Sequence, residues 1–195
     1  MLHRLASDIA RIIVKKANID DKYRSIYEYG CELFLSTSAS ILSIIFFSLM
    51  LNAPYSSIVF LTVFMGIRFF SGGYHATTYL HCFIVTNLIY LISYIASLTF
   101  VKYIGIAEEI LLIWAAASVI VAFSPIRHKN HPLSENLYRR NAHIARIITL
   151  AIAFSTTALT IRYGCNPVLS MAVVTLTDVA VMMMIPKILE GAMLK

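Results

Sequence analysis

The pattern of apolar and polar positions divides the chain into six apolar segments joined by short polar stretches. A helix needs about 20 mostly apolar residues to cross a bilayer. Two segments, 56–70 and 147–161, are shorter, and short spans can thin the bilayer locally. The six segments are residues 31–51, 56–70, 82–101, 106–124, 147–161 and 168–185. The pattern therefore predicts an all-α polytopic membrane protein with about six transmembrane helices.

The N-terminal segment, residues 1–30, has a different pattern. Large aliphatic residues recur at helical spacing, and charged residues occupy the other faces. The aliphatic set is Leu2, Leu5, Ile9, Ile12 and Ile13, and the charged set is Arg4, Asp8, Arg11 and Lys15. We expect an amphipathic helix that lies on the inner leaflet and contacts anionic lipids. The alternative is a cytosolic helix that docks a peptide.

Composition agrees with a membrane protein. Of the 195 residues, 59% are hydrophobic and 13% are charged, and the mean hydropathy is +0.77. The net charge of +6 raises nucleic acid as a partner, but the basic residues flank apolar segments. All Lys and Arg residues except Lys102 and Arg162 lie in 1–30, 68–81, 125–146 and 186–195. The positive-inside rule therefore predicts cytoplasmic N- and C-termini in the cell membrane, and no nucleic acid.

We accordingly expect two parts: an interfacial segment at 1–30 and a single transmembrane helical domain at 31–195. The three cysteines, Cys31, Cys82 and Cys165, are far apart and form no CxxC pair. This spacing excludes a disulfide framework or a zinc cluster as the obvious interpretation. Three loop histidines, His128, His131 and His143, also lack metal-ligand spacing. We expect no metal and no cofactor.

The most informative stretch is the predicted cytoplasmic turn RFFSGGYHATTYLHC, residues 68–82. A cysteine becomes nucleophilic when a neighbour favours its thiolate, and a histidine is the usual partner. His81 is adjacent to Cys82, so on a helix its side chain points about 100° away. His75, seven residues back, shares the face of Cys82 but lies roughly 10 Å along a continuous helix. A His75–Cys82 dyad therefore requires a bend.

The Gly-Gly pair, Gly72 and Gly73, makes that bend possible, because glycine accepts positive φ angles. Arg68 precedes the turn. It can extend to the inner phosphates, favour the Cys82 thiolate, or bind a substrate carboxylate with two hydrogen bonds. Each of these residues by itself commonly has only a structural role. A cysteine in a membrane helix usually packs as a small side chain, a histidine at the interface is usually just solvated, and a Gly-Gly pair usually forms a turn.

These residues resemble the accessory gene regulator protein B (AgrB) family of Gram-positive bacteria. That family has a histidine and a cysteine seven residues apart, after a Gly-Gly pair and an upstream arginine. A second match is FSPIRHKNHPLSE, residues 123–135, which is similar to the family's Ser-Pro loop. Many members have Lys-Pro where this chain has His131-Pro132.

The resemblance implies a membrane cysteine endopeptidase that cuts the C-terminal part from a short AgrD-like precursor peptide. The product would be a cyclic autoinducing peptide for quorum sensing. His75 would be the general base and Cys82 the nucleophile, which forms a thioester that an internal thiol or hydroxyl displaces. The active site would lie at the cytoplasmic face, and the resemblance also implies a homodimer.

Asp178 and two basic residues are further candidates. Asp178, inside the sixth segment, could orient His75 or pair with Arg68; the alternative is a helix-packing hydrogen bond with a hydroxyl of another span. The basic loop 125–146 is interpreted first as an orientation signal and lipid contact. Arg139 and Arg140 in this loop could also receive an acidic precursor tail.

Two other functions are alternatives to the peptidase. A small transporter or exporter would explain the intramembrane acid Asp178, although the sequence has no inverted repeat. It predicts that Cys82 is dispensable. A membrane scaffold without chemistry predicts that both Cys82 and His75 are dispensable.

Overall fold

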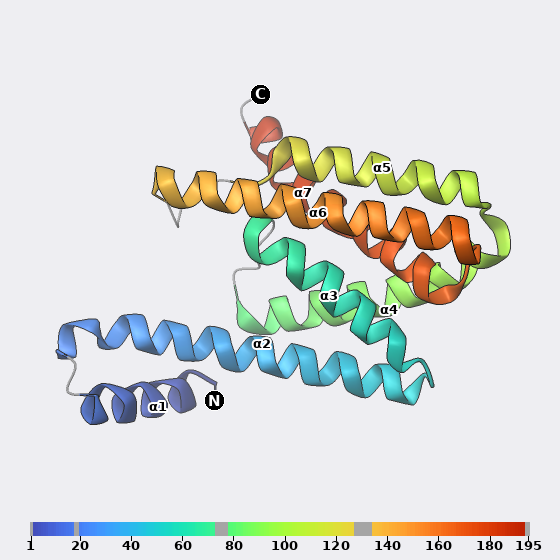
Figure 1. The fold of residues 1–195 in the computed structure, drawn as a ribbon. Helices are drawn as coiled ribbons and strands as arrows, with labels where there is room; N and C mark the ends of the chain where they lie inside the picture. The colour runs from blue at the N-terminus through green and yellow to red at the C-terminus, as the bar shows by residue number, and fades with distance from the viewer. Residues whose placement is uncertain (1, 18–19, 73–77, 127–133, 194–195) are drawn as a thin grey trace. The chain divides into compact units, whose positions relative to one another are not determined.

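The computed structural model of the chain describes residues 2–17, 20–72, 78–126 and 134–193, without the side chains of Leu2 and of 186–193. The described residues form helices and no strand, which confirms the predicted all-α fold (Figure 1). The elements are α1 (Leu2–Lys16), the 3₁₀ turn η1 (Asp21–Tyr23), α2 (Arg24–Met50), α3 (Pro54–Ser71), α4 (Tyr79–Tyr103), α5 (Ile106–Phe123), α6 (Glu135–Tyr163) and α7 (Pro167–Met193).

Six stretches of the described residues are long and apolar enough to cross a membrane. They are Asp21–Met50, Pro54–Ser71, Tyr79–Tyr103, Ile106–Phe123, Glu135–Tyr163 and Pro167–Ile185. The predicted number of spans is therefore confirmed, and each predicted apolar segment lies mainly or wholly within one of these helices. The orientation of the termini stays a prediction.

Local chemistry explains where several helices begin and end. Pro54 occupies the first turn of α3, where a backbone N–H is not needed. Gly72 ends α3 with a φ of 69° and donates its N–H to the Arg68 carbonyl. Ser134 caps α6 by accepting a hydrogen bond from the Leu137 amide. Gly164 ends α6 with a φ of 73°.

One predicted boundary is wrong. Residues 125–146 were expected to be a loop, but α6 already begins at Glu135. The hydropathy falls over 135–146 because of its Arg, Asn and His residues, whereas these residues do not prevent helix formation. The Ser134 cap starts the helix about three turns before the apolar part. Only residues 124–134 connect α5 to α6.

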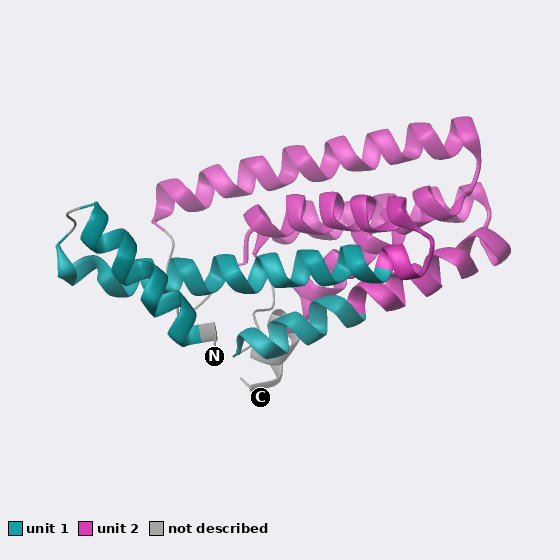
Figure 2. Cartoon of the chain, turned by 90° about the horizontal axis from the view of Figure 1, so that it is seen from below, with its two compact units in different colours: residues 1–47, 76–88 teal, residues 48–75, 89–195 magenta. Residues whose placement is uncertain are grey.

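The contacts divide the chain into two compact units, which are described separately (Figure 2). Unit 1 comprises residues 1–47 and 76–88, and unit 2 comprises residues 48–75 and 89–195. Both α2 and α4 contribute residues to both units. The first ten residues of α4, including Cys82, therefore belong with α1 and most of α2.

In unit 2, α7 is the central helix. It packs against α3, α5 and α6, and it has the most buried of the six spans. The part of α4 in this unit adds Tyr90, which is fully buried and forms a 2.7 Å hydrogen bond with Ser56 of α3. The Tyr90 ring also packs edge-on against Phe60, with ring centroids 5.3 Å apart.

In unit 1, α1 and α2 are antiparallel, because His3 pairs with Glu32 and Ser7 with Glu28. The buried face of α1 consists of small or short side chains, Ala6, Ala10 and Val14. The larger aliphatic side chains Leu5, Ile12 and Ile13 are exposed. The aliphatic face predicted to contact lipid is thus largely separate from the face that packs in the protein.

Candidate active site

The sequence motif at 68–82 begins at the end of α3. Arg68 is half-buried there, with its Nη1 3.1 Å from Met182 Sδ of α7 and its Cζ 5.2 Å from the centroid of the Phe64 ring. The cation–π geometry and the sulfur contact hold the guanidinium against the protein. Arg68 is therefore a packed residue of unit 2 at the point where the candidate turn leaves the helix.

Gly72, directly after α3, lies beside the second sequence motif. The Ile126 amide donates a 3.0 Å hydrogen bond to the Ser71 carbonyl. A Cβ on Gly72 would lie 3.5 Å from the Ile126 carbonyl oxygen. Ser124 and Pro125, which are joined by a cis peptide bond, are both buried. The start of the Gly-Gly turn and the start of the Ser-Pro loop are thus fixed to each other within unit 2.

Cys82 lies in the first turn of α4. Its amide donates a 3.0 Å hydrogen bond to the Thr78 carbonyl, and the His81 amide donates a 3.2 Å hydrogen bond to Thr78 Oγ1. Thr78 therefore acts as the N-cap of this helix. The Cys82 side chain is half-buried, and all three cysteines are free thiols. Helix N-termini are positions at which cysteine thiolates are stabilised.

The predicted partners of Cys82 are only partly described. His75 and Gly73 lie outside the described residues, as do His128 and His131, so the dyad stays a prediction. His81 is exposed, and its Nδ1 lies 3.4 Å from Thr78 Oγ1. Among the residues that the structure describes, no three His, Cys, Asp or Glu residues could hold a metal ion together.

Asp178 forms a helix-packing contact in unit 2. Ser93 of α4 donates a 2.5 Å hydrogen bond to Asp178 Oδ2. Met182, which contacts Arg68, is one helical turn further along α7. Arg68 therefore reaches α7 about one turn from Asp178. The Ser93 contact is the interaction expected from the packing interpretation of Asp178.

Arg139 and Arg140 are exposed in the first two turns of α6. Arg139 Nε donates a 3.2 Å hydrogen bond to Glu135 Oε1 in an i, i+4 ion pair. Because the pair is exposed, it adds little stability. Both guanidinium groups are presented by a helix rather than by the predicted loop.

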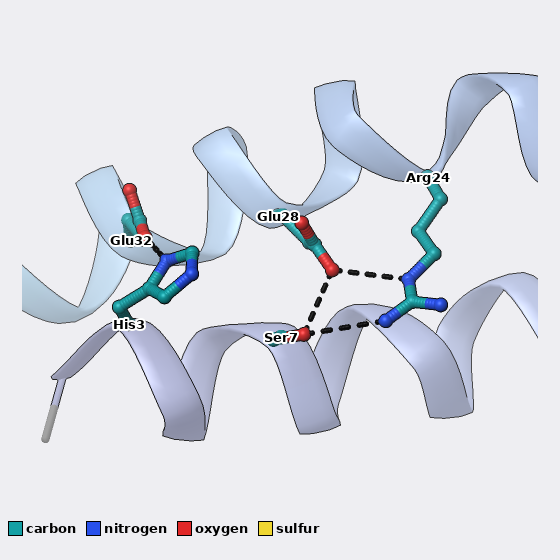
Figure 3. Close-up of polar contacts among 5 residues, drawn as sticks. All are labelled: His3, Ser7, Arg24, Glu28 and Glu32. Carbon is teal, nitrogen blue, oxygen red and sulfur yellow. Dashed lines mark hydrogen bonds and ion pairs between the residues drawn. The ribbon is translucent and has the colours of Figure 1, made fainter.

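A polar network in unit 1 was not assigned from the sequence (Figure 3). Glu28 accepts hydrogen bonds from Ser7 at 2.8 Å and from Arg24 Nε at 3.0 Å. One turn further along α2, Glu32 is hydrogen-bonded to His3 Nδ1. In the sequence, this network is indicated by two glutamates four residues apart, which share one face of a helix. Glu28 precedes the first apolar segment, and Glu32 lies at its start.

Glu109 is a second group that the sequence did not assign to a site. It is fully buried in the first turn of α5 and accepts a hydrogen bond from Ser170 Oγ of α7. Its carboxylate lies close to the Cys165 thiol. Burial raises the pKa of that thiol, and the neighbouring Glu109 carboxylate raises it further.

Comparison with known proteins places these features in a family. The family model described as accessory gene regulator B matches residues 6–185. AgrB-like protein 2 of Clostridium perfringens (strain 13 / Type A) is 23% identical over 175 residues, covering 84% of this chain and 80% of that protein. An AgrB-like protein of Clostridium perfringens (strain SM101 / Type A) is 24% identical over 142 residues, covering 68% and 64% respectively. No solved structure matches.

Proposed function

The chain belongs to the accessory gene regulator B family, and we propose that it is a membrane-embedded cysteine endopeptidase that processes a short precursor peptide. Family membership supports a role in peptide processing within an accessory gene regulator system. Six apolar helices support a multi-pass membrane location. The cysteine mechanism, the cyclic product and the cytoplasmic active site are our proposal.

The observation that carries the proposal is the position of Cys82. Cys82 is half-buried in the first turn of α4, where the helix dipole favours an anion. The motif at 68–82, which resembles the family, begins with Arg68 in α3 and continues with Gly72. The hydrogen bond from the Ile126 amide to the Ser71 carbonyl holds the chain next to Gly72. His75 lies between Gly72 and Cys82 in the sequence.

In the proposed reaction, His75 removes the proton from the Cys82 thiol, and the sulfur attacks the scissile carbonyl carbon. The peptide C–N bond then breaks, and the protonated His75 donates the proton to the leaving amine. The N-terminal part of the precursor is left on Cys82 as a thioester. A thiol or hydroxyl within the same peptide attacks this thioester, which gives a thiolactone or lactone and returns the proton and the free thiol to the enzyme. Exclusion of water would favour cyclisation over hydrolysis.

The decisive experiment uses the purified protein in liposomes and a synthetic AgrD-like precursor from the same organism. We expect wild type to release the C-terminal fragment and to form a hydroxylamine-sensitive adduct on Cys82, both detected by mass spectrometry. Cys82→Ala and His75→Ala should abolish both products. Cys31→Ala and Cys165→Ala are the matched controls and should retain them.

Cleavage by Cys82→Ala would overturn the cysteine mechanism, whereas no cleavage by wild type would return the transporter and scaffold interpretations. A second readout needs no precursor. At neutral pH we expect Cys82 to be alkylated faster than Cys31 and Cys165, and His75→Ala should remove this difference.

A further inference from the structure

The Glu32 carboxylate connects three helices of unit 1. His3 of α1 is hydrogen-bonded to Glu32 Oε1, and the Tyr79 hydroxyl of α4 lies close enough to the same carboxylate to interact with it. The side chain of Glu32 is only 14% exposed, whereas that of His3 is 76% exposed. Glu32 is therefore the less exposed partner, and both other helices share it.

Tyr79 begins α4, and Cys82 follows three residues later in the same first turn. Residues three apart on a helix lie on nearly the same face, so a restraint on Tyr79 also restrains the Cys82 side chain. The contacts of the whole chain agree with this, because residues 76–88 group with α1 and α2 rather than with the remainder of α4.

The neighbouring carboxylate differs in one respect. Glu28 lies one turn before Glu32 on α2 and also holds α1, through Ser7. Its second hydrogen-bond partner, Arg24, is in α2 itself. Both glutamates therefore attach α1 to α2, but of the two only Glu32 also has an α4 partner, Tyr79, among the described contacts. This pair provides a matched comparison within one structure (Figure 3).

From these contacts we propose that Glu32 is a positioning residue, which holds the first turn of α4, and with it Cys82, against the α1–α2 hairpin through Tyr79. The proposal rests on the proposed function of Cys82. It gives α1 a role beyond membrane attachment, because His3 of α1 is hydrogen-bonded to the same carboxylate. A displacement of about 1 Å at a reacting group can cost on the order of 10²-fold in rate.

The test uses full-length protein in liposomes and compares Glu32→Gln, Tyr79→Phe and Glu28→Gln. Tyr79→Phe removes one hydroxyl and keeps the ring, so it stays informative if Glu32→Gln folds poorly. We expect Glu32→Gln and Tyr79→Phe each to lower kcat for precursor cleavage on the order of tenfold to a hundredfold with KM nearly unchanged. Glu28→Gln should lower thermal stability as Glu32→Gln does but leave kcat near wild type.

The double variant should show that the two groups act together. Glu32→Gln combined with Tyr79→Phe should be no slower than the slower single variant, whereas Glu28→Gln combined with Tyr79→Phe should be additive. The alkylation rate of Cys82, with Cys31 as the internal reference, should change in the same variants as kcat. Equal effects of Glu28→Gln and Glu32→Gln on kcat, or an unchanged Tyr79→Phe, would overturn the proposal.

Failure of the proposed cysteine mechanism can be distinguished from failure of the positioning role of Glu32. If Cys82→Ala still cleaves the precursor, Cys82 is not the nucleophile. The alkylation rate of Cys82 still reports whether Glu32 and Tyr79 position its thiol. A change in that rate without any change in cleavage therefore identifies a failure of the cysteine mechanism, not of the positioning contact.

Discussion

The amide of Ile126 donates a 3.0 Å hydrogen bond to the carbonyl of Ser71. The two residues are 55 positions apart, and each lies within a segment that resembles the AgrB family. The contact places the end of α3 beside the residue that follows the Ser-Pro pair. The conformation of Gly72, immediately after Ser71, is therefore determined by both segments.

Gly72→Ala should destabilise this junction. The φ of 69° and ψ of −146° form a combination that is essentially restricted to glycine, and its cost for another residue is roughly 1–3 kcal/mol. The added methyl group would meet only an ordinary contact with the Ile126 oxygen, so backbone strain is the main effect. We expect a lower thermal midpoint in detergent and slower precursor cleavage.

Gly66→Ala is the control for this variant, because Gly66 lies within α3 and has no atom within 4 Å of the added Cβ. An alanine in a helix interior is favoured over glycine by roughly 0.5–1 kcal/mol. The thermal midpoint should stay the same or rise. Equal losses at Gly66 and Gly72 would contradict the strain argument.

Asp178→Asn should leave precursor cleavage nearly unchanged. The asparagine retains an oxygen that can accept the Ser93 hydrogen bond, so the packing contact between α4 and α7 persists. Asp178→Leu should instead lower stability, and its coupling with Ser93→Ala should be about 0.6–1.7 kcal/mol. A large loss of kcat in a stable Asp178→Asn protein would show that the charge takes part in catalysis.

Charge reversal at Arg139 and Arg140 should raise the KM for an acidic precursor. Both side chains are exposed on α6, and exposed charge pairs are worth up to about 1 kcal/mol each, so the double variant should raise KM by up to about thirtyfold. The effect should shrink at high salt. The alkylation rate of Cys82 should not change.

Arg162→Glu is the control for these reversals, because Arg162 is exposed at the opposite end of the same helix. The precursor KM of this variant should equal that of wild type. If Arg162→Glu and the double reversal have the same effect, net charge rather than a docking site explains the result.

Glu109→Gln should make Cys165 more reactive. The negative carboxylate disfavours the thiolate and raises the pKa of Cys165, so removing the charge should lower that pKa. At a fixed pH near 8, a larger fraction of the thiol is then ionised and alkylation is faster. Glu108→Gln should have a smaller effect, because Glu108 is exposed to solvent. Slower alkylation in Glu109→Gln would contradict this sign.

The sequence by itself determined the number and approximate position of the membrane spans. A bilayer requires about 20 apolar residues for each crossing, and this requirement is local to each segment. Local residues also account for several helix ends, because proline fits the first turn at Pro54 and glycine accepts the positive φ angles at Gly72 and Gly164. The family resemblance rested equally on local patterns, such as the spacing of His75 and Cys82.

Only the tertiary structure decided which separated residues meet. The hydrogen bonds from His3 to Glu32, from Ser93 to Asp178, and from Ile126 to Ser71 all join residues that are at least 29 positions apart. Hydropathy describes how one segment interacts with its solvent and contains no information about its neighbour. The partner of a buried polar group is set by helix packing, because each such group must find a hydrogen bond where the fold places one.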